Sequence, residues 1–315
     1  MKKRRCHMLS IWVFGPLFLL AAGCRTAPRY QHLDTVANGG RQWFQAIEKA
    51  AAKLADDGRL TAPGDLLTTL PAKTRLKAPR PVGRYRSGPD LYRHARRATV
   101  VVGAVRNCTN PRCSIRKHVN PASGVIVHPA GIVATNYHVI QKTNHLGLVV
   151  GTDDGRVFPV VEILAANEKQ DVALLRIEGE AFPFLPPAGD APPGTDIYVL
   201  SHPRQEMYQM SKGVVTGYHI RKTYDKETKT VGERRSMNVS ADYAKGSSGG
   251  PILDAYGRVV GLVSATEPVY YIEKPEEHDL IQMVIKRCVP GSDIVSLFAP
   301  DRASDTGSKP RADNL

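Results

Sequence analysis

The feature that most constrains the fold is a succession of short Val- and Ile-rich runs, each bounded by Gly, Pro, Asn or Asp. Runs of this length with turn residues between them are typical of antiparallel strands in an all-β barrel. The segment Pro186–Gly194 separates two sets of runs and reads as their connection, because prolines lack an N–H and stop strand pairing. The expected strands are Thr99–Val105, Gly124–Val127, Ile132–Asn136, Leu146–Val150, Val157–Leu164 and Val172–Ile177 before it, and Ile197–Ser201, Gly213–His219, Met237–Ser240, Pro251–Leu253, Val259–Val263 and Gln282–Ile285 after it.

Three residues of the types that acyl transfer requires lie beside these runs. His138 follows an expected strand, Asp171 precedes one, and Ser248 lies in the glycine-rich segment before Pro251. A serine hydroxyl needs an imidazole to take its proton and a carboxylate to hold the imidazole in the useful tautomer. Taken singly, a Gly-Ser run also fits a flexible linker, and such His and Asp residues fit core and strand-start positions. Their convergence favours a triad in which Ser248 is the nucleophile, His138 the base and Asp171 the orienting acid.

The glycines around the serine pair have a separate task. Gly246 and Gly249 let the backbone turn sharply and aim N–H groups at a developing negative charge. The expected oxyanion hole consists of the Gly246 and Ser248 amides.

These segments resemble trypsin-like serine peptidases of the HtrA-type branch, and the match spans residues 98–298. The resemblance implies an all-β, double β-barrel chymotrypsin-like fold, with barrel one over about 98–185, barrel two over about 194–298 and the active site in the cleft between them. It also implies polypeptide substrates and a mechanism that needs no metal or organic cofactor. The matching stretches are 122–140, 171–177, 200–203, 211–217, 246–251 and 261–264, the last in the substrate-pairing strand.

The chain departs from the family pattern in two ways. Ser247 stands where digestive trypsin-like enzymes carry an acid that captures a newly cut N-terminus, so activation by that ion pair is not expected. HtrA-type proteins usually carry PDZ domains after the protease, but barrel two needs most of the residues that follow Ser248, so no PDZ domain is expected.

Substrate preference rests on three positions. Asp242 lies six residues before Ser248, where trypsin-type enzymes place the acid that binds a Lys or Arg side chain. The acid-rich segment Glu267–Asp279 would rim the same cleft and favour basic substrates. Against this, Thr266 lies two residues after Ser264, where a deep pocket prefers glycine, so Asp242 is alternatively a polar wall or turn residue.

The N-terminus predicts export. Residues 1–23 carry a Lys/Arg cluster and then an apolar run of about 14 residues, which is too short to span a bilayer and is typical of a signal peptide. Small residues before Cys24 resemble a lipobox, so Cys24 is the expected lipidation site and membrane anchor, in the extracytoplasmic part of a bacterial cell envelope. An ordinary signal peptide with an incidental cysteine is the alternative.

Three cysteines remain in an exported chain. Export favours oxidation, and the Asn-Pro turn between Cys108 and Cys113 favours a disulfide between these two. Pairing of Cys288 with either of them, or a metal site formed by Cys108, Cys113 and His118, are the alternatives.

Charge is concentrated before the expected barrels. The net charge of the chain is +13, yet residues 98–298 hold 21 bases and 21 acids, whereas residues 72–97 hold nine bases and one acid. The stretch 72–97 is also rich in Pro and Gly, which predicts an extended basic linker that contacts anionic lipid or cell-wall polymer, or else a solvated linker without a partner. Nucleic-acid binding is not expected, because no recognisable module is present.

The remaining segments flank this arrangement. Residues 24–71 form an N-terminal region with a helix over Gln42–Asp57, whose apolar stripe either packs on the barrels or contacts a partner. A short C-terminal helix is expected over about Ser292–Phe298, followed by a disordered polar tail over 299–315.

Together these features predict an exported serine endopeptidase that works through an acyl-enzyme. An esterase on the same scaffold, or an inactive lipoprotein that binds peptides in the cleft, are the alternatives.

Overall fold

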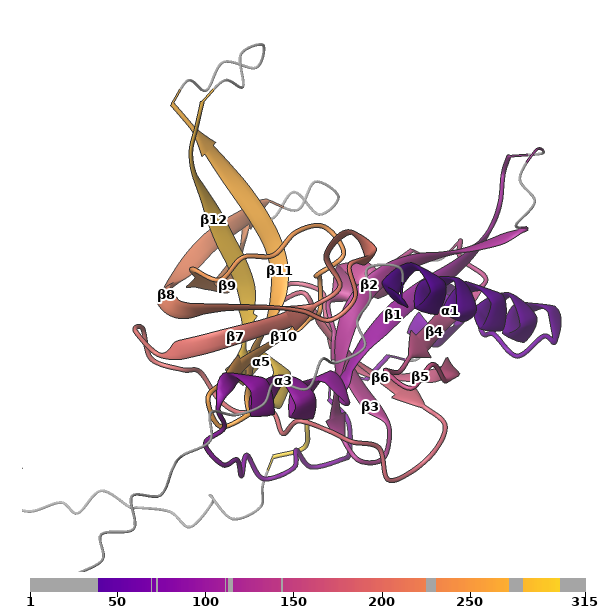
Figure 1. Cartoon of the computed structure of the whole chain (residues 1–315), viewed down its shortest axis with the longest axis horizontal. Helices are drawn as coiled ribbons and strands as arrows, with labels where there is room; N and C mark the ends of the chain where they lie inside the picture. The colour runs from indigo at the N-terminus through magenta and orange to yellow at the C-terminus, as the bar shows by residue number, and fades with distance from the viewer. Residues whose placement is uncertain are drawn as a thin grey trace, which may run out of the picture. The chain divides into compact units, whose positions relative to one another are not determined.

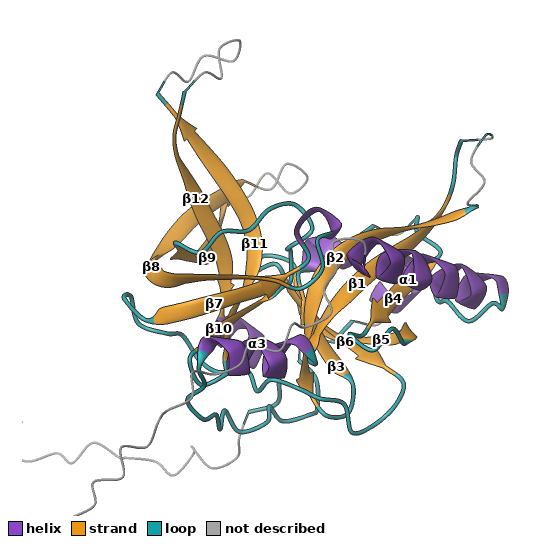
Figure 2. Ribbon diagram, viewed as in Figure 1, coloured by secondary structure: helices purple, strands orange, loops and turns teal. Residues whose placement is uncertain are grey.

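The structure, a computed structural model, describes residues 39–300 except 69, 72, 111, 113–115, 143, 225–230 and 272–279. Two closed six-stranded barrels dominate it, as Figures 1 and 2 show. This confirms the predicted all-β, double-barrel class. Closure leaves no long unpaired strand edge within either barrel.

Barrel one has the strand order β1-β2-β3-β6-β5-β4, and all its neighbours are antiparallel. Its strands are β1 (Thr99–Asn107), β2 (Lys117–His128), β3 (Ile132–Thr135), β4 (Gly147–Gly151), β5 (Val157–Asn167) and β6 (Val172–Ile177). Strand β1 closes the barrel, because Val102 faces Ala122 of β2 on one side and Val150 of β4 on the other.

Barrel two has the strand order β10-β11-β12-β9-β8-β7. Its strands are β7 (Asp196–Ser201), β8 (Gln209–Tyr224), β9 (Val231–Val239), β10 (Pro251–Asp254), β11 (Val259–Tyr270) and β12 (Ile281–Pro290). The β8–β9 and β11–β12 pairs extend beyond the barrel as two ribbons (Figure 1). These ribbons make β8, β9 and β11 longer than the sequence predicts, whereas β12 continues from the predicted Gln282–Ile285 into the barrel as far as Pro290.

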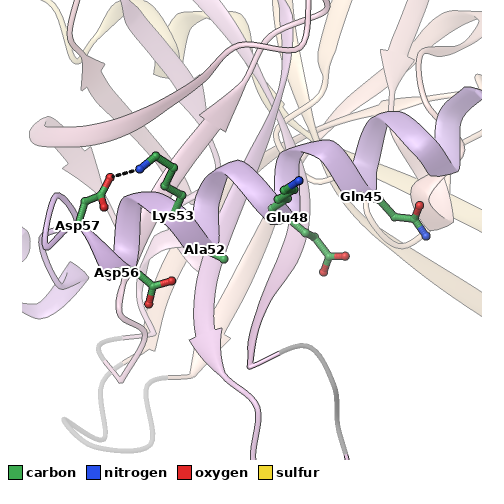
Figure 3. A pocket seen from close by; sticks show the side chains of 7 residues that line it. Gln45, Glu48, Ala52, Lys53, Asp56 and Asp57 are labelled. Atoms are coloured by element: carbon green, nitrogen blue, oxygen red, sulfur yellow. Dashed lines mark hydrogen bonds and ion pairs between the residues drawn. The ribbon is translucent and has the colours of Figure 1, made fainter.

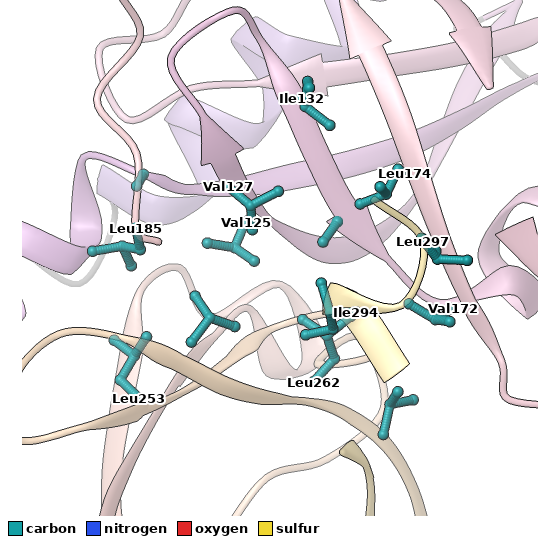
Figure 4. Packing of buried hydrophobic residues seen from close by; sticks show 14 of the residues in the cluster. Val125, Val127, Ile132, Val172, Leu174, Leu185, Leu253, Leu262, Ile294 and Leu297 are labelled. Atoms are coloured by element: carbon teal, nitrogen blue, oxygen red, sulfur yellow. The ribbon is translucent and has the colours of Figure 1, made fainter. Parts of the chain in front are cut away.

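Each barrel has its own apolar interior, and a third apolar cluster joins them. This cluster takes Val125 and Leu174 from barrel one, Leu253 and Leu262 from barrel two, and Ile294 from the C-terminal helix (Figure 4). Full burial of one such side chain contributes about 1.5–3 kcal/mol, so the barrels are held together by a core and not by surface contacts alone.

Two helices cover this core. Helix α5 (Gly291–Val295) is shorter than the expected 292–298 and places Ile294 against the joint between the barrels. Helix α3 (Gly88–Arg96) buries Leu91 and Ala95 in the same cluster. Its Ser87 side chain accepts a hydrogen bond from the Asp90 N–H at 3.4 Å and caps the helix. The expectation of an extended linker over 72–97 is therefore wrong for Gly88–Arg96, because a cap and a buried Leu–Ala stripe outweigh the charge of the segment.

The N-terminal helix is present as α1 (Gly39–Asp56) and packs on barrel one. Phe44, Ile47 and Ala51 are buried, as the predicted stripe requires. A second short helix, α2 (Pro63–Leu67), was not expected.

Candidate active site

His138 lies in the one-turn helix α4 (Tyr137–Ile140), directly after strand β3. Its ring Nδ1 lies 2.9 Å from Asp171 Oδ1 and 3.0 Å from Asp171 Oδ2, and its backbone N–H donates to Oδ1 at 3.0 Å. An ionised carboxylate can only accept, so the neutral ring carries its proton on Nδ1 and keeps Nε2 as a base. The His138 side chain is 40% exposed, whereas that of Asp171 is 6% exposed.

Asp171 ends the tight turn between β5 and β6 and has a φ of 60°. This left-handed conformation costs a non-glycine residue about 1–2 kcal/mol. The turn is held by the Asn136 side-chain amide, which donates to the Asp171 carbonyl oxygen at 3.0 Å. The carboxylate is thereby fixed under the His138 ring.

Two side chains of barrel two also reach this carboxylate. Ser264 Oγ donates to Asp171 Oδ2 at 2.7 Å, and Arg234 Nη2 donates to the same oxygen at 3.0 Å. Burial alone would raise the pKa of the Asp171 carboxyl, but the hydrogen bonds and charge of His138 and the charge of Arg234 outweigh it and hold the pKa below its ordinary value. Asp171 is therefore ionised at neutral pH.

Ser248 is joined to this cluster through Ser264. The Ser248 hydroxyl donates to the Ser264 carbonyl oxygen at 3.3 Å, while the Ser264 hydroxyl binds Asp171. The structure therefore brings the three predicted residues to one place, where the two barrels meet. In this conformation the Ser248 hydroxyl is directed at a carbonyl on β11.

The loop before Ser248 turns at a position that requires glycine. Gly246 has a φ of +99°, and a Cβ there would lie 2.7 Å from the His202 carbonyl oxygen, so only glycine fits. Among the described residues, the backbone hydrogen bonds of this loop start from the N–H groups of Ser247, Gly249 and Gly250, and none starts from Gly246 or Ser248. These two amides are the ones that the sequence assigned to the oxyanion hole.

Barrel one fixes this loop from the other side. Ser123 on β2 donates from its N–H to the Ser248 carbonyl oxygen at 2.8 Å and from its hydroxyl to the Gly246 carbonyl oxygen at 2.9 Å. Ser247, which stands where an activating acid would be, is buried and accepts a hydrogen bond from Ser201 Oγ at 3.0 Å. The oxyanion loop is therefore positioned by neutral hydrogen bonds.

Helix α1 supports these contacts through the ring of Trp43. The Trp43 ring lies 5.7 Å from the Tyr208 ring, edge to face, and 6.4 Å from the His202 ring. The Tyr208 N–H donates to His202 Nδ1 at 3.1 Å, and the His202 N–H donates to Ser123 Oγ at 3.1 Å. Complete burial lowers the pKa of His202 to about 3, so the ring is neutral and accepts the Tyr208 hydrogen bond. Trp43 is thus linked to Gly246 through a continuous chain of contacts.

Arg234 and Ser123 are site residues that sequence reasoning missed. Arg234 lies on β9 within the Glu233–Arg235 run, which reads as an ordinary exposed strand segment. Its contact with Asp171 depends on how barrel two faces barrel one, and no local pattern indicates that. Ser123 lies inside the stretch that carries the family resemblance, but its hydrogen bonds follow from the fold alone.

The residues predicted to set specificity are placed differently from one another. Ser264 lies in the site, and Thr266 is exposed on β11. The Asp242 side chain is 90% exposed and is paired with Lys286, whose side chain is only 12% exposed. A role of Asp242 in substrate binding stays a prediction. Of the predicted acidic rim, Glu267 pairs with Arg287 and Arg221, while 272–279 lie outside the described residues.

The structure describes Cys108 and Cys288, two of the three cysteines in the disulfide prediction. Cys113 lies outside the described residues, so its disulfide with Cys108 stays a prediction. Cys288 is a buried free thiol, 3.5 Å from the Tyr243 hydroxyl, and the alternative in which it pairs with Cys108 is not found. In the part of the chain that the structure describes, no group of three His, Cys, Asp or Glu side chains is arranged to hold a metal ion.

The predicted signal peptide and Cys24 lie outside the described residues, as does most of the C-terminal tail. Among the helices that are described, none has both the length and the apolar character needed to cross a membrane.

A hollow of about 670 Å³ runs along helix α1 and is separate from this site. Its lining comes from α1 and the turn after it and includes Gln45, Glu48, Lys53 and Asp56 (Figure 3). It contains neither a base beside a nucleophile nor free backbone amides, so it does not compete with the Ser248 region as a reaction centre.

Comparison with known proteins agrees with this geometry. Residues 122–262 match the family described as trypsin-like peptidase domain. The chain is 30% identical over 156 residues to "Protease Do-like 5, chloroplastic" of Arabidopsis thaliana, a match that covers 46% of this chain and 47% of that protein. It is 26% identical over 145 residues to "Serine endoprotease DegS" of Haemophilus influenzae, which covers 45% of this chain and 41% of that protein.

Among solved structures, the chain is similar to one titled "HtrA-type protease AlgW with decapeptide". The TM-score is 0.49 and the identity 17%, over 67% of this chain and 66% of that one. The matches cover less than half of the length of the two curated relatives. Over residues 122–262 the chain is thus similar to trypsin-like peptidase domains, and the curated proteins that it resembles there are named as proteases.

Proposed function

We propose that the protein is a serine endopeptidase that cleaves polypeptides through an acyl-enzyme. The observation that carries the proposal is the hydrogen-bonded cluster in which Ser264 joins Ser248 to the Asp171–His138 pair. The trypsin-like match and the names of the relatives support a protease more than any other hydrolase.

In the proposed reaction, the Ser248 side chain first turns from the Ser264 carbonyl toward His138 Nε2. Oγ then attacks the peptide carbonyl carbon, and Nε2 takes the hydroxyl proton while Asp171 stabilises the imidazolium. The Gly246 and Ser248 amides bind the oxyanion. Collapse of the tetrahedral intermediate breaks the C–N bond, and His138 returns the proton to the leaving amine. Water, activated by the same ring, hydrolyses the ester and regenerates Ser248.

Two alternatives remain on the same scaffold, an esterase and a lipoprotein that binds peptides without cleaving them. Three features count against a pure binding module, because peptide binding alone requires none of them. Asp171 is ionised, its hydrogen bond with His138 Nδ1 leaves Nε2 to act as a base, and the Gly246 and Ser248 amides donate to no backbone carbonyl among the described residues.

A fluorophosphonate probe separates these possibilities. We expect the purified chain to gain one covalent adduct on Ser248, measured by intact mass, and to digest casein. Ser248→Ala is the matched control and should do neither. Absence of an adduct on the wild-type chain would overturn the proposal of an active hydrolase, and an adduct together with ester but no casein hydrolysis would favour the esterase.

We also propose that the chain is exported and lipid-anchored at Cys24 on the extracytoplasmic side of a bacterial envelope. The lipobox-like sequence supports this. Labelling with palmitate should appear in the wild-type chain and vanish in Cys24→Ala, whereas Cys6→Ala, the matched control in the signal segment, should keep the label.

Contact with an anionic surface is a further part of this proposal. Arg84, Arg86, Arg93 and Arg97 line one hollow on and before α3, together with a single acid, Asp90, which already pairs with Arg93. We expect vesicles of anionic lipid to retain the chain at low salt and release it at high salt. Equal retention on neutral vesicles would count against the contact.

A further inference from the structure

A second hollow, of about 670 Å³, borders the oxyanion loop and has Gly246 in its wall. Three cationic side chains line it, Lys142, Arg204 and Lys245, and no carboxylate does. The remaining polar side chains of the lining are neutral amides. A hollow of this size falls within the range of about 300–1,000 Å³ that is usual for ligand sites.

The position of this hollow follows from the contacts of Ser248. On one side of the serine, its hydroxyl binds Ser264 and the Gly249 N–H binds the Val263 carbonyl, so β11 is its neighbour. On the other side, the Ser248 carbonyl accepts the Ser123 N–H of β2. The hollow lies on the β2 side, because Asn120 of the same strand is in its lining.

A peptide attacked at Ser248 lies between β11 on one side and Gly246 and β2 on the other. We place the acyl part of the substrate on β11 and the leaving part, with its new amino terminus, past Gly246 toward β2.

The three cations come from three separate segments. Lys142 follows helix α4, Arg204 lies in the 3-10 turn η1 (Pro203–Gln205), and Lys245 precedes Gly246. The Arg204 N–H donates to the Lys245 carbonyl oxygen at 2.7 Å, which fixes two of these backbones together.

Among the residues that the structure describes, no acid pairs with any of these three cations. Other exposed lysines of the chain pair with carboxylates, as Lys53 does with Asp57 at 3.0 Å and Lys212 with Asp196 at 2.8 Å. Within the described residues, no ion pair includes Lys142, Arg204 or Lys245. Like charges that converge on one hollow repel one another, and a bound anion relieves that repulsion.

We propose that this hollow is a subsite for an acidic side chain on the leaving-group side of the scissile bond, so that the enzyme favours substrates with Asp or Glu just after the cleaved bond. The inference rests on the proposed peptidase function. It concerns the side chains that follow the cleaved bond, so it is independent of which side chain precedes that bond.

Internally quenched peptides test this preference on the full mature chain. The base peptide is taken from a site at which the enzyme cuts casein, and Glu, Gln or Lys is placed at each of the first three positions after the cut. We expect kcat/KM to be about ten-fold higher for Glu than for Gln at one of these positions, with Lys poorest. The ratio of Glu to Gln should fall toward one at 0.5 M salt, because exposed charges are screened.

Substitution of each cation tests which of them binds the acidic side chain of the substrate. Lys142→Gln, Arg204→Gln and Lys245→Gln should each reduce the Glu-to-Gln ratio, and Lys142→Glu should favour the Lys peptide instead. Lys49→Gln on α1 is the matched control and should leave the ratio unchanged. The ratio is compared within each variant, so a general loss of activity does not imitate the effect.

The results distinguish failure of the subsite from failure of the proposed peptidase function. Equal rates for the Glu, Gln and Lys peptides, or a ratio that survives in the triple Gln variant, would overturn the subsite. A wild-type chain that neither cleaves casein nor reacts with fluorophosphonate would instead overturn the proposed function, and the subsite with it.

Discussion

Arg234 Nη2 donates a hydrogen bond to Asp171 Oδ2 at 3.0 Å, so a barrel-two cation contacts the carboxylate that orients His138. The same guanidinium nitrogen donates to Ser264 Oγ at 3.0 Å, which ties it to the strand beside Ser248. The Arg234 side chain is 25% exposed and therefore only partly screened by water. Its charge lies beside the Asp171–His138 pair, on which the proposed mechanism depends.

Replacing Arg234 should change the pH dependence of activity. Its charge helps to hold the pKa of the Asp171 carboxyl below its ordinary value, so Arg234→Gln should raise that pKa and move the acid limb of the kcat/KM profile, where Asp171 becomes protonated, to higher pH. Arg234→Lys keeps a positive charge and should retain the wild-type limb. A profile that moves equally in both variants would show that loss of the fork geometry, and not charge, is responsible.

Trp43 should act as a positioning residue for the oxyanion loop. Trp43→Ala removes the ring that covers His202 and Tyr208, and we expect the rate of reaction with fluorophosphonate to fall about ten-fold, because a loosened amide costs less than the loss of a donor. Trp43→Phe should recover most of the rate, and Lys49→Ala on the same helix should have no effect.

A second readout separates positioning from general destabilisation. The chain has two tryptophans, and Trp12 falls in the predicted signal peptide, so Trp43 alone would report fluorescence in the mature chain. Its emission should shift when Ser248 is phosphonylated. A slow Ala variant that has also lost its cooperative unfolding transition would count against a specific role, and Trp43→Leu would then test the ring with less loss of volume.

Asp293 should lower stability at neutral pH. Burial raises the pKa of its carboxyl to about 6, helped by the nearby Asp190, and its Oδ2 has no hydrogen-bond partner among the described residues. The Asp293 carboxyl therefore keeps its proton to higher pH in the folded state than in the unfolded state, where it ionises near pH 4. The resulting loss of folding stability is absent below about pH 4 and complete above about pH 6. Asp293→Asn should raise the stability at pH 7 by about 1 kcal/mol, after discounting for solvent, and by less at pH 4. Thermal melts at the two pH values measure this difference, and an equal change at both would contradict it.

Cys288 should be inert in the folded protein. Burial raises the pKa of its thiol to about 12, and the Tyr243 hydroxyl packs against the sulfur. Iodoacetamide should modify Cys288 only after denaturation, as read from peptide masses. Rapid modification of the native chain would mean that this part of barrel two opens readily.

Much of the fold was predictable because buried strands leave a strong pattern. The runs at 99–105, 132–136 and 172–177 are apolar nearly throughout, and each became a strand of barrel one. The ribbon parts of β8, β9 and β11 were missed because many of their side chains are exposed, as at Ile220 and Val231, and their order comes from pairing between strands.

In the candidate site, too, local sequence indicates some residues, whereas others depend on long-range contacts. Ser248, His138 and Asp171 lie in local sequences whose glycines and strand boundaries identify them. The roles of Arg234 and Trp43 arise from contacts between segments far apart in the chain, 63 positions for Arg234 and Asp171. The partner of Asp242 was unexpected for a similar reason, because the pairing of β12 with β9 sets Lys286 opposite Val239, three residues before Asp242.

The resting position of the Ser248 hydroxyl has a consequence for control. The hydroxyl rests on the Ser264 carbonyl oxygen of β11, which is the kind of acceptor that an incoming strand of substrate would take for its own N–H. In the proposed mechanism, docking of a peptide would then release the Ser248 hydroxyl to turn toward the His138 ring. The nucleophile would become available only when a substrate is bound.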